Sequence, residues 1–253
     1  MEMTQLVRRL GRSDLKLIGR DRFLIFMFLF AVYIAVALRF LLPWADGYLA
    51  DHDIMPGPSI PLRLAEIYPM LVAFMGLFTG ALLVGTVFGF VLLDEKDNNT
   101  LRAMLVTPVP LPRYLLYRVG LPAVLAMVIV LGMVLVINQA VPPLWQLLPL
   151  AAGAGLTAPI VTLFFATFAE NKVQGFAYTK FAGVSGWTIM VGYFLVAPWQ
   201  WLIGLFPPFW ISKAFWLALD GNPFWWLVLL LGIGLQVGLI YWLINRFTRT
   251  IYR

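Results

Sequence analysis

The sequence predicts an all-α polytopic membrane protein with six transmembrane helices, because its composition and the lengths of its apolar stretches agree. Hydrophobic residues make up 62% of the 253 residues and charged residues only 12%, whereas soluble domains carry roughly 25% charged residues. A hydrocarbon core about 30 Å thick requires about 20 helical residues to cross it. Six apolar stretches have approximately this length: 23–43, 67–93, 114–138, 145–168, 181–198 and 224–245. We therefore expect residues 1–253 to form a single transmembrane domain with no appended soluble domain.

The distribution of basic residues predicts which ends of these helices face the cytoplasm. Fifteen of the 18 Lys and Arg residues lie before the first apolar stretch, after the second, after the fourth and after the last. The opposite side holds Arg39, Arg63 and Lys213. By the positive-inside rule, both termini are then cytoplasmic. Because the basic residues are spread along a membrane face, topology explains the net charge of +6, and we expect no nucleic-acid partner.

Residues 1–22 are expected to form a cytoplasmic interfacial helix. Basic residues recur there at helical spacing and give one basic face: Arg9, Arg12, Lys16 and Arg20. Apolar side chains form a second face, although Asp14 lies near that apolar stripe and weakens the pattern. A helix of this kind lies in the membrane interface beside anionic lipid. Two interpretations stay open: a lipid-bound anchor that sets the topology, or a helix that also forms a docking surface for a partner.

Two further polar segments are expected on the side opposite the termini. The segment 44–66 is rich in proline and is not expected to form a long helix. Its His52 lies between Asp51 and Asp53, which indicates a solvated acidic loop, since zinc sites usually have three or four protein ligands. The segment 199–223 is too apolar for a hydrated loop and is broken at Pro207 and Pro208. We expect one or two re-entrant or interfacial helices there, before the last span.

The sequence also argues against two energy sources for a transporter: ATP hydrolysis by this chain and coupling to a proton or sodium gradient. It holds no G-x-x-x-x-G-K-[ST] phosphate-binding loop, so it is not expected to hydrolyse ATP by that mechanism. No Asp, Glu, Lys or His lies near the middle of any expected span, where proton- and sodium-coupled carriers usually place ionisable groups. The main polar side chains at that depth are Thr79 and Gln236, and both are expected to form helix–helix hydrogen bonds. A transporter built in this way would take its energy from a partner.

The segment 94–118 is the most informative polar part of the chain. It begins with an acidic turn, after which Asn98, Asn99 or Thr100 can cap a new helix. Three apolar residues of that helix share one face: Leu101, Met104 and Leu105. Three prolines then end it before the third span: Pro108, Pro110 and Pro112.

This segment resembles the ABC type-2 transporter permease family, whose members carry an acidic–basic–acidic run, Gly-Thr, an apolar helical turn and a proline after the second span. The residues that carry the resemblance are Glu95, Lys96, Asp97, Asn98, Asn99, Thr100, Leu101, Met104, Leu105, Pro108 and Tyr114. Asn99 replaces the usual glycine, and Asn tolerates left-handed backbone better than most residues. The span count, the cytoplasmic termini and the re-entrant segment also fit this family. Residues 14–30, DLKLIGRDRFLIFMFLF, resemble its drug-exporting, fluoroquinolone-type members.

The resemblance implies a permease subunit of an ATP-driven exporter, with no active site of its own. Two such subunits, identical or paralogous, would pair, and each would dock a separate ATPase subunit that binds ATP and Mg²⁺. The residues implied in that docking lie in the coupling loop, 94–113, and in the N-terminal helix: Glu95, Thr100, Leu101, Arg102, Met104, Leu105, Pro108, Arg12 and Lys16. The complex would move a hydrophobic or amphipathic compound, a drug or a lipid, outward across a bacterial cytoplasmic membrane. We expect neither a cofactor nor a metal in this chain.

The resemblance also implies a substrate path between the paired subunits, lined largely by the second and fifth spans. The side chains that these spans offer are Met75, Phe78, Thr79, Leu82, Trp187, Met190, Tyr193 and Phe194. Met and aromatic side chains suit irregular hydrophobic ligands. For each of these residues, packing against other helices or facing lipid is an equally good interpretation.

An intramembrane, magnesium-dependent prenyltransferase is the alternative from another functional class. Asp94, Glu95 and Asp97 at a cytoplasmic helix end are similar to the acidic loop with which such enzymes hold Mg²⁺ against a diphosphate. Those enzymes use two acidic motifs, and the other cytoplasmic loop, 169–180, offers only Glu170. The exporter is therefore the favoured hypothesis.

Overall fold

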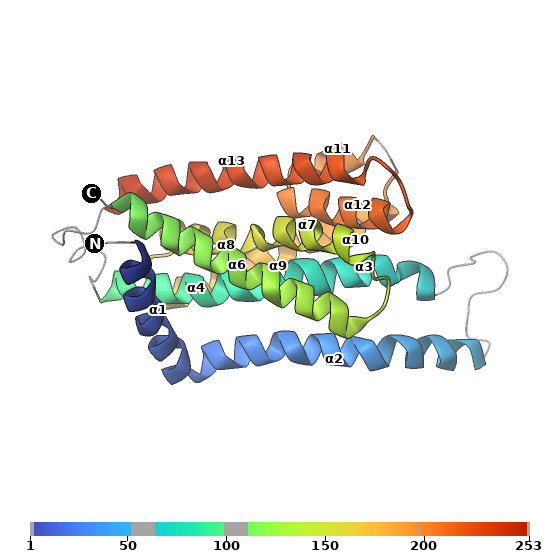
Figure 1. Ribbon diagram of the computed structural model, residues 1–253, viewed down its shortest axis with the longest axis horizontal. Helices are drawn as coiled ribbons and strands as arrows, with labels where there is room; N and C mark the ends of the chain where they lie inside the picture. The colour runs from blue at the N-terminus through green and yellow to red at the C-terminus, as the bar shows by residue number, and fades with distance from the viewer. Residues whose placement is uncertain (1–2, 52–63, 99–110, 197, 252–253) are drawn as a thin grey trace.

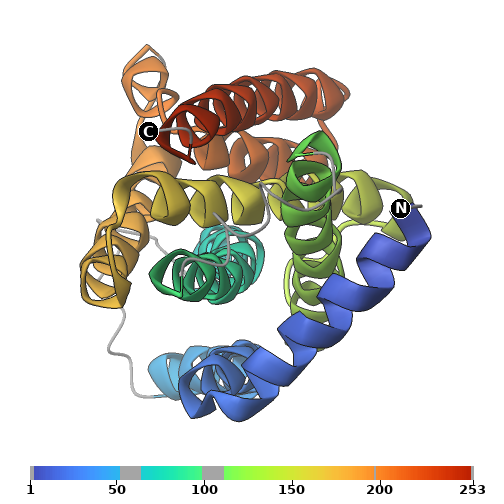
Figure 2. The ribbon, with the colours of Figure 1, turned by 90° about the vertical axis from the view of Figure 1, so that its left-hand side faces the viewer.

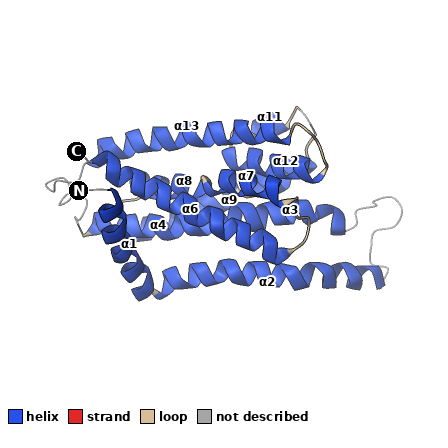
Figure 3. Ribbon diagram, in the orientation of Figure 1, coloured by secondary structure: helices blue, strands red, loops and turns tan. Residues whose placement is uncertain are grey.

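The computed structural model describes residues 3–51, 64–98, 111–196 and 198–251. Every regular element within these ranges is a helix, as the sequence predicts (Figure 3). The long helices run side by side and form an elongated bundle (Figure 1). We call the end of the bundle where α1 and the C-terminal end of α13 lie the terminal end, and the other end the distal end.

The helices follow one another in a simple order. They are α1 (Met3–Arg20), α2 (Arg22–Asp51), the 3₁₀-helix η1 (Leu64–Ile67), α3 (Tyr68–Val72), the π-helix η2 (Ala73–Phe78), α4 (Thr79–Asp97), α6 (Leu111–Ile137), α7 (Leu144–Gly155), α8 (Thr157–Phe168), α9 (Lys172–Ser185), α10 (Trp187–Phe194), α11 (Gln200–Ile203), α12 (Pro207–Leu219) and α13 (Trp225–Ile251). Helix α1 is amphipathic and lies across the terminal end of the bundle (Figure 2).

Five helical stretches of the described residues are long and apolar enough to cross a membrane. They are Arg22–Leu49, Leu64–Asp97, Arg113–Ile137, Leu144–Phe168 and Trp225–Arg249. These correspond to five of the six expected spans. The remaining one, the fifth in chain order, is formed by α9 followed by α10. The described part of the chain is therefore all-helical, and the chain is a multi-pass membrane protein.

The fifth span begins earlier than the sequence predicts. The apolar stretch suggests a start at residue 181, but α9 begins at Lys172. The Asn171 side chain accepts a hydrogen bond from the Gln174 backbone N–H at 3.0 Å, and the Gln174 side chain accepts one from the Glu170 backbone N–H at 2.9 Å. The first bond is an N-cap interaction, and the second ties the N3 side chain back to the residue before the N-cap, so local hydrogen bonds rather than apolar side chains mark the start of this helix.

The first span continues past its expected end. Helix α2 runs through Pro43 to Asp51, although the sequence predicts no long helix after residue 43. Proline is tolerated inside membrane helices, because neighbouring groups satisfy the freed backbone. The rest of the 44–66 segment, including His52, lies largely outside the described residues.

Helix α4 forms the centre of the bundle (Figure 2). All residues from Gly80 to Leu93 are buried, and α4 packs against α2, α6, α8 and α9. Gly85 and Gly89 let α8 approach closely, since an added Cβ would lie 2.6 Å from the Ala158 carbonyl oxygen and 2.7 Å from the Phe165 ring, respectively. Small residues have this role in membrane helix packing generally.

The segment between the fifth and last spans forms the two short helices α11 and α12, in agreement with the expected re-entrant element. The N-terminal end of α12 lies inside the bundle, where Pro207 and Leu239 line the same cavity. Leu239 is near the middle of a 25-residue candidate span. At the other end of α12, the Trp216 indole N–H donates to the Pro69 carbonyl at 3.1 Å. The segment therefore dips to the middle of the bundle and returns.

Candidate functional site: a buried ion cluster and an apolar cavity

A group of charged and phenolic side chains lies at the terminal end, where α1 crosses α4 and α6. It consists of Asp14, Glu95, Tyr114, Tyr117 and Arg118, which we call the Arg118 cluster. The Arg118 guanidinium bonds Asp14 with an Nη1–Oδ2 distance of 2.8 Å and bonds Glu95 through Nη2. The Tyr117 hydroxyl donates to Asp14 at 2.7 Å, and the Tyr114 hydroxyl donates to Glu95 at 2.6 Å. Arg118 Nε donates to the Tyr114 oxygen at 3.1 Å.

The cluster is almost completely removed from solvent. The side chain of Arg118 is 1% exposed, that of Asp14 4% and that of Glu95 14%. Buried charges cost several kcal/mol each unless they are paired and hydrogen-bonded. Arginine suits this position, since its planar fork can serve two carboxylates and it stays protonated. The two tyrosine hydroxyls occupy further acceptor sites of the carboxylates, so the charges are held in one geometry.

The cluster joins three helices next to the predicted coupling loop. Asp14 belongs to α1, Glu95 to the end of α4, and the other three residues to the start of α6. Helices α4 and α6 flank the segment 99–110, which lies outside the described residues. The predicted coupling residues of that segment are Thr100, Leu101, Arg102, Met104, Leu105 and Pro108. The cluster therefore fastens the interfacial helix to both helices from which the predicted coupling loop extends.

The other predicted coupling residues are described by the structure. Glu95 is inside the cluster and binds Arg118 and Tyr114. Arg12 and Lys16 are exposed on α1. Lys16 lines a polar groove at the junction of α1, α2 and α4 together with Asp21 and Asp94. These residues thus come together at one end of the bundle, with Glu95 in the interior and the two basic residues at the surface.

A second set of polar contacts connects α9 to the same end of α4. Lys172 Nζ lies 2.6 Å from Asp94 Oδ1, and Lys96 Nζ donates to the Ala169 carbonyl at 2.7 Å. With Glu95 bound to Arg118, two of the three carboxylates of the acidic turn already have a cation. Among the described residues no group of three or more His, Asp or Glu side chains is placed to hold a metal ion. The prenyltransferase alternative therefore has no support.

The predicted substrate-path residues lie at several places in the single chain, and the path between paired subunits stays a prediction. Phe78 and Leu82 are buried and line a common cavity. Trp187 and Phe194 are exposed on α10. The Tyr193 hydroxyl donates to the Glu66 carbonyl at 2.6 Å.

The remaining three predicted path residues, Met75, Thr79 and Met190, are half-buried. The Thr79 hydroxyl donates to the Phe74 carbonyl at 2.9 Å. That bond is within its own span, so the expected helix–helix hydrogen bond of Thr79 is wrong.

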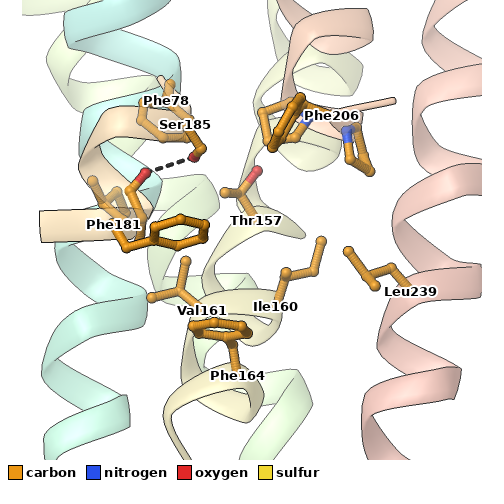
Figure 4. Close-up of a pocket in the computed structure, with 13 residues that line it drawn as sticks. Phe78, Thr157, Ile160, Val161, Phe164, Phe181, Ser185, Phe206 and Leu239 are labelled. Carbon is orange, nitrogen blue, oxygen red and sulfur yellow. Dashed lines mark hydrogen bonds between the residues drawn. The ribbon is translucent and has the colours of Figure 1, made fainter. Parts of the chain in front are cut away.

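The cavity that contains Phe78 and Leu82 has a volume of about 170 Å³ and almost wholly apolar walls. Its lining comes from η2, α4, α8, α9, α13 and the start of α12, and it includes Thr157, Val161, Phe164, Phe181, Ser185, Phe206 and Leu239 (Figure 4). No pattern in the sequence predicted this cavity. Its walls come from five separate stretches, and no local pattern marks their convergence; only the Pro207–Pro208 break pointed to an irregularity.

Gln236 is the second mid-span polar residue singled out by the sequence. It is completely buried on α13. Neither its Oε1 nor its Nε2 has a hydrogen-bond partner within the described part of the chain. The expected helix–helix hydrogen bond of Gln236 is therefore also wrong for the residues described.

Comparisons with known proteins identify a family and two relatives to which the chain is similar. The model of the family described as "Fluoroquinolones export permease protein Rv2686c-like" matches residues 14–244. Two proteins of Mycobacterium tuberculosis, named fluoroquinolones export permease protein MT2760 (strain CDC 1551 / Oshkosh) and Rv2686c (strain ATCC 25618 / H37Rv), are each 29% identical over 240 residues. The alignment covers 94% of this chain and 92% of each relative.

Proposed function

Because the chain belongs to the Rv2686c-like fluoroquinolones export permease family, we propose that it is the membrane-spanning permease subunit of an ATP-driven exporter. A separate ATPase subunit would supply the energy and would bind ATP and Mg²⁺. Two permease subunits, identical or paralogous, would form the membrane part of the complex. The chain itself would catalyse no reaction and hold no cofactor.

The observation that carries this proposal is the Arg118 cluster. A permease powered by a separate ATPase needs a stiff connection between the surface that docks the ATPase and the helices that must move. Here buried ionic hydrogen bonds join α1 to α4 and α6, and these two helices flank the predicted coupling loop. Rigid elements and ionic networks of this kind can carry coupling between distant sites.

The proposed docking surface lies at the terminal end and faces the cytoplasm of a bacterium. Its parts are the 94–113 coupling loop and the exposed basic side chains of α1, among them Arg12 and Lys16. The same basic side chains can contact anionic lipid headgroups at the inner face of the membrane. Nucleotide binding by the ATPase would displace the coupling loop, and the cluster would pass that displacement to α1, α4 and α6 together.

The proposed cargo is an amphipathic aromatic compound. The two relatives are named for the export of fluoroquinolones, and the cavity next to α4 is apolar and lined by aromatic rings. Such a compound can partition into the inner leaflet and reach the bundle from there. The proposed direction of movement is outward.

The test of this proposal is co-purification with the ATPase subunit. The double variant Leu101→Asp and Leu105→Asp places charge on the apolar face of the predicted coupling helix, and it should abolish association while the permease still inserts into the membrane. Val173→Asp is the matched control. Val173 is 78% exposed at the start of α9, at the terminal end of the bundle, and it lies outside the proposed surface. Unaltered co-purification of the double variant would show that the coupling-helix assignment is wrong.

A further inference from the structure

The cavity beside α4 lies where four interruptions of helical structure meet. Phe78 is the last residue of the π-helix η2, and Thr157 is the first residue of α8 after the break at Leu156. Ser185 is the last residue of α9 before Gly186, and Pro207 begins α12. All four residues line the cavity, and Figure 4 labels Phe78, Thr157 and Ser185 among them.

This convergence is unexpected for a region that only packs. Irregular backbone at membrane depth is tolerated where it is buried in protein or lines a cavity, and π-helical turns occur frequently at functional sites. Thr157 and Leu239 are both near the middle of 25-residue candidate spans. The cavity is therefore at the depth where transporters with broken helices bind their cargo.

The cavity is partly open, and its size and walls indicate which chemical group fits it. Its volume is about 170 Å³, and an engineered apolar cavity of about 150 Å³ accepts benzene. Four of its lining residues are phenylalanines: Phe78, Phe164, Phe181 and Phe206. Their rings can stack on, or meet edge-to-face, a flat aromatic guest, an attraction that a saturated acyl chain cannot share.

Two hydroxyl groups are the polar features of the wall. The Ser185 hydroxyl donates to the Ala182 carbonyl at 2.6 Å, so it can still accept a hydrogen bond. The Thr157 hydroxyl lies in the wall on the side of Phe206 (Figure 4). A guest with one carbonyl or N–H group could therefore bond the wall while its ring stays among the phenylalanines.

We propose that this cavity, within a single subunit, is a binding site for a one- or two-ring aromatic group that carries a hydrogen-bonding substituent. The inference rests on the proposed exporter function and names the part of the cargo that a single subunit recognises. Two of its wall residues, Phe78 and Leu82, are also residues of the predicted path between paired subunits. Movement at the four interruptions would change its shape.

The test measures binding of 4-quinolone, a two-ring aromatic with one carbonyl and one N–H, to the purified full chain in detergent by equilibrium dialysis. Ala182→Trp fills the cavity and should weaken binding by at least about tenfold, which is 1.4 kcal/mol. Val184→Trp is the matched control, because Val184 is 61% exposed on the same helix and does not line the cavity. It should leave the dissociation constant within about twofold.

A gentler variant keeps the proposal testable where Ala182→Trp does not fold. Thr157→Val keeps the side-chain shape and removes the hydroxyl, so it should weaken 4-quinolone binding about three- to tenfold. It should leave the binding of naphthalene, which has no polar substituent, unchanged. The proposal is overturned by equal loss or no loss for both probes, or by equal 4-quinolone affinity in folded Ala182→Trp and the unmodified chain.

Two other outcomes separate this inference from the proposed function. Palmitate that binds in an Ala182-dependent manner, while 4-quinolone does not, would identify an acyl-chain site and overturn the inference. Because no ATPase is present in the binding assay, its failure leaves co-purification with the ATPase unaffected. Binding of 4-quinolone by a chain that associates with no ATPase would instead overturn the proposed function.

Discussion

The terminal end and the middle of the bundle differ in the interactions that hold their helices together. At the terminal end, α4 and α6 are regular helices, and the Arg118 cluster fastens them to α1 through paired charges. In the middle, four helical interruptions surround an apolar cavity, and Gln236 is buried without a partner among the described residues. Stiffness is therefore concentrated where force would enter, and deformability where cargo would be held.

The difference shows how a membrane protein without a charged centre can still transmit motion. Paired buried charges have a narrow energy minimum, because separating them exposes each to a medium that cannot solvate it. Apolar walls lose little when they slide past one another, since contacts with lipid or other side chains replace those that are lost. A displacement of the terminal end would thus move α1, α4 and α6 as a unit. The helices around the cavity would change their packing to accommodate it.

Arg118→Met tests the stiff side of this comparison and should have the largest effect. The change leaves Asp14 and Glu95 buried without their cation, and removal of one partner from a buried pair costs about 3–5 kcal/mol. We expect the free energy of unfolding in detergent, measured by denaturant titration, to fall by about that amount. Arg12→Met, at an exposed position on α1, should change it by less than about 0.5 kcal/mol.

The triple variant Asp14→Asn, Glu95→Gln and Arg118→Met distinguishes charge from packing in the cluster. With no uncompensated charge left, it should recover a large part of the lost stability. An unfolding midpoint of Arg118→Met equal to that of the unmodified protein would mean that the cluster does not hold these helices together.

Gly186→Ala tests the deformable side. An added Cβ would lie 2.3 Å and 2.6 Å from the rings of Phe78 and Phe74, so we expect a loss of about 1–3 kcal/mol from overpacking. Gly183→Ala, one turn earlier, adds a Cβ with no atom within 4 Å and should stabilise the helix by up to about 1 kcal/mol. Equal thermal unfolding midpoints for the two variants would argue against close packing at the α9–α10 break.

Gln236→Leu tests whether the middle of the bundle carries an unpaired polar group. Removing a buried amide without partners should raise the free energy of unfolding by about 1 kcal/mol or more. The measurement is denaturant titration of the purified protein. A loss of stability would instead mean that water, lipid or a second subunit satisfies Gln236, and the contrast with the Arg118 cluster would weaken.

Lys172→Met should have the smallest effect. Its ammonium group lies 2.6 Å from Asp94, but its side chain is 39% exposed, and ion pairs at such positions contribute no more than about 1 kcal/mol. The difference from the unmodified protein should disappear in 1 M salt, where charges are screened beyond about 3 Å. A loss as large as that of Arg118→Met would remove the distinction between buried and exposed pairs at the terminal end.

Hydropathy predicted the spans, because a membrane-spanning helix requires one contiguous apolar stretch of sufficient length, which can be read directly from the sequence. It did not place the start of the fifth span, since the helix there depends on the cap formed by Asn171 and Gln174 rather than on apolar side chains. The pattern N-x-x-Q was available as a signal. Pro43 likewise suggested that the first helix would end there, but α2 continues through it to Asp51.

The Arg118 cluster could be predicted only in part. Asp14 lies near an apolar stripe and weakens its pattern, and Glu95 is one of the residues that carry the family resemblance. Arg118 appeared only as one basic residue among those that set the topology. Its pairing joins positions 104 residues apart, and only the tertiary arrangement brings them together. The cavity was beyond sequence analysis for the same reason.

The most direct test of the account is uptake of a labelled amphipathic aromatic drug into inside-out proteoliposomes that contain the permease, with and without its ATPase subunit. We predict uphill accumulation only when the ATPase and ATP are both present, and none with Arg118→Met in complexes that still assemble. Uphill accumulation by the permease alone would contradict the account.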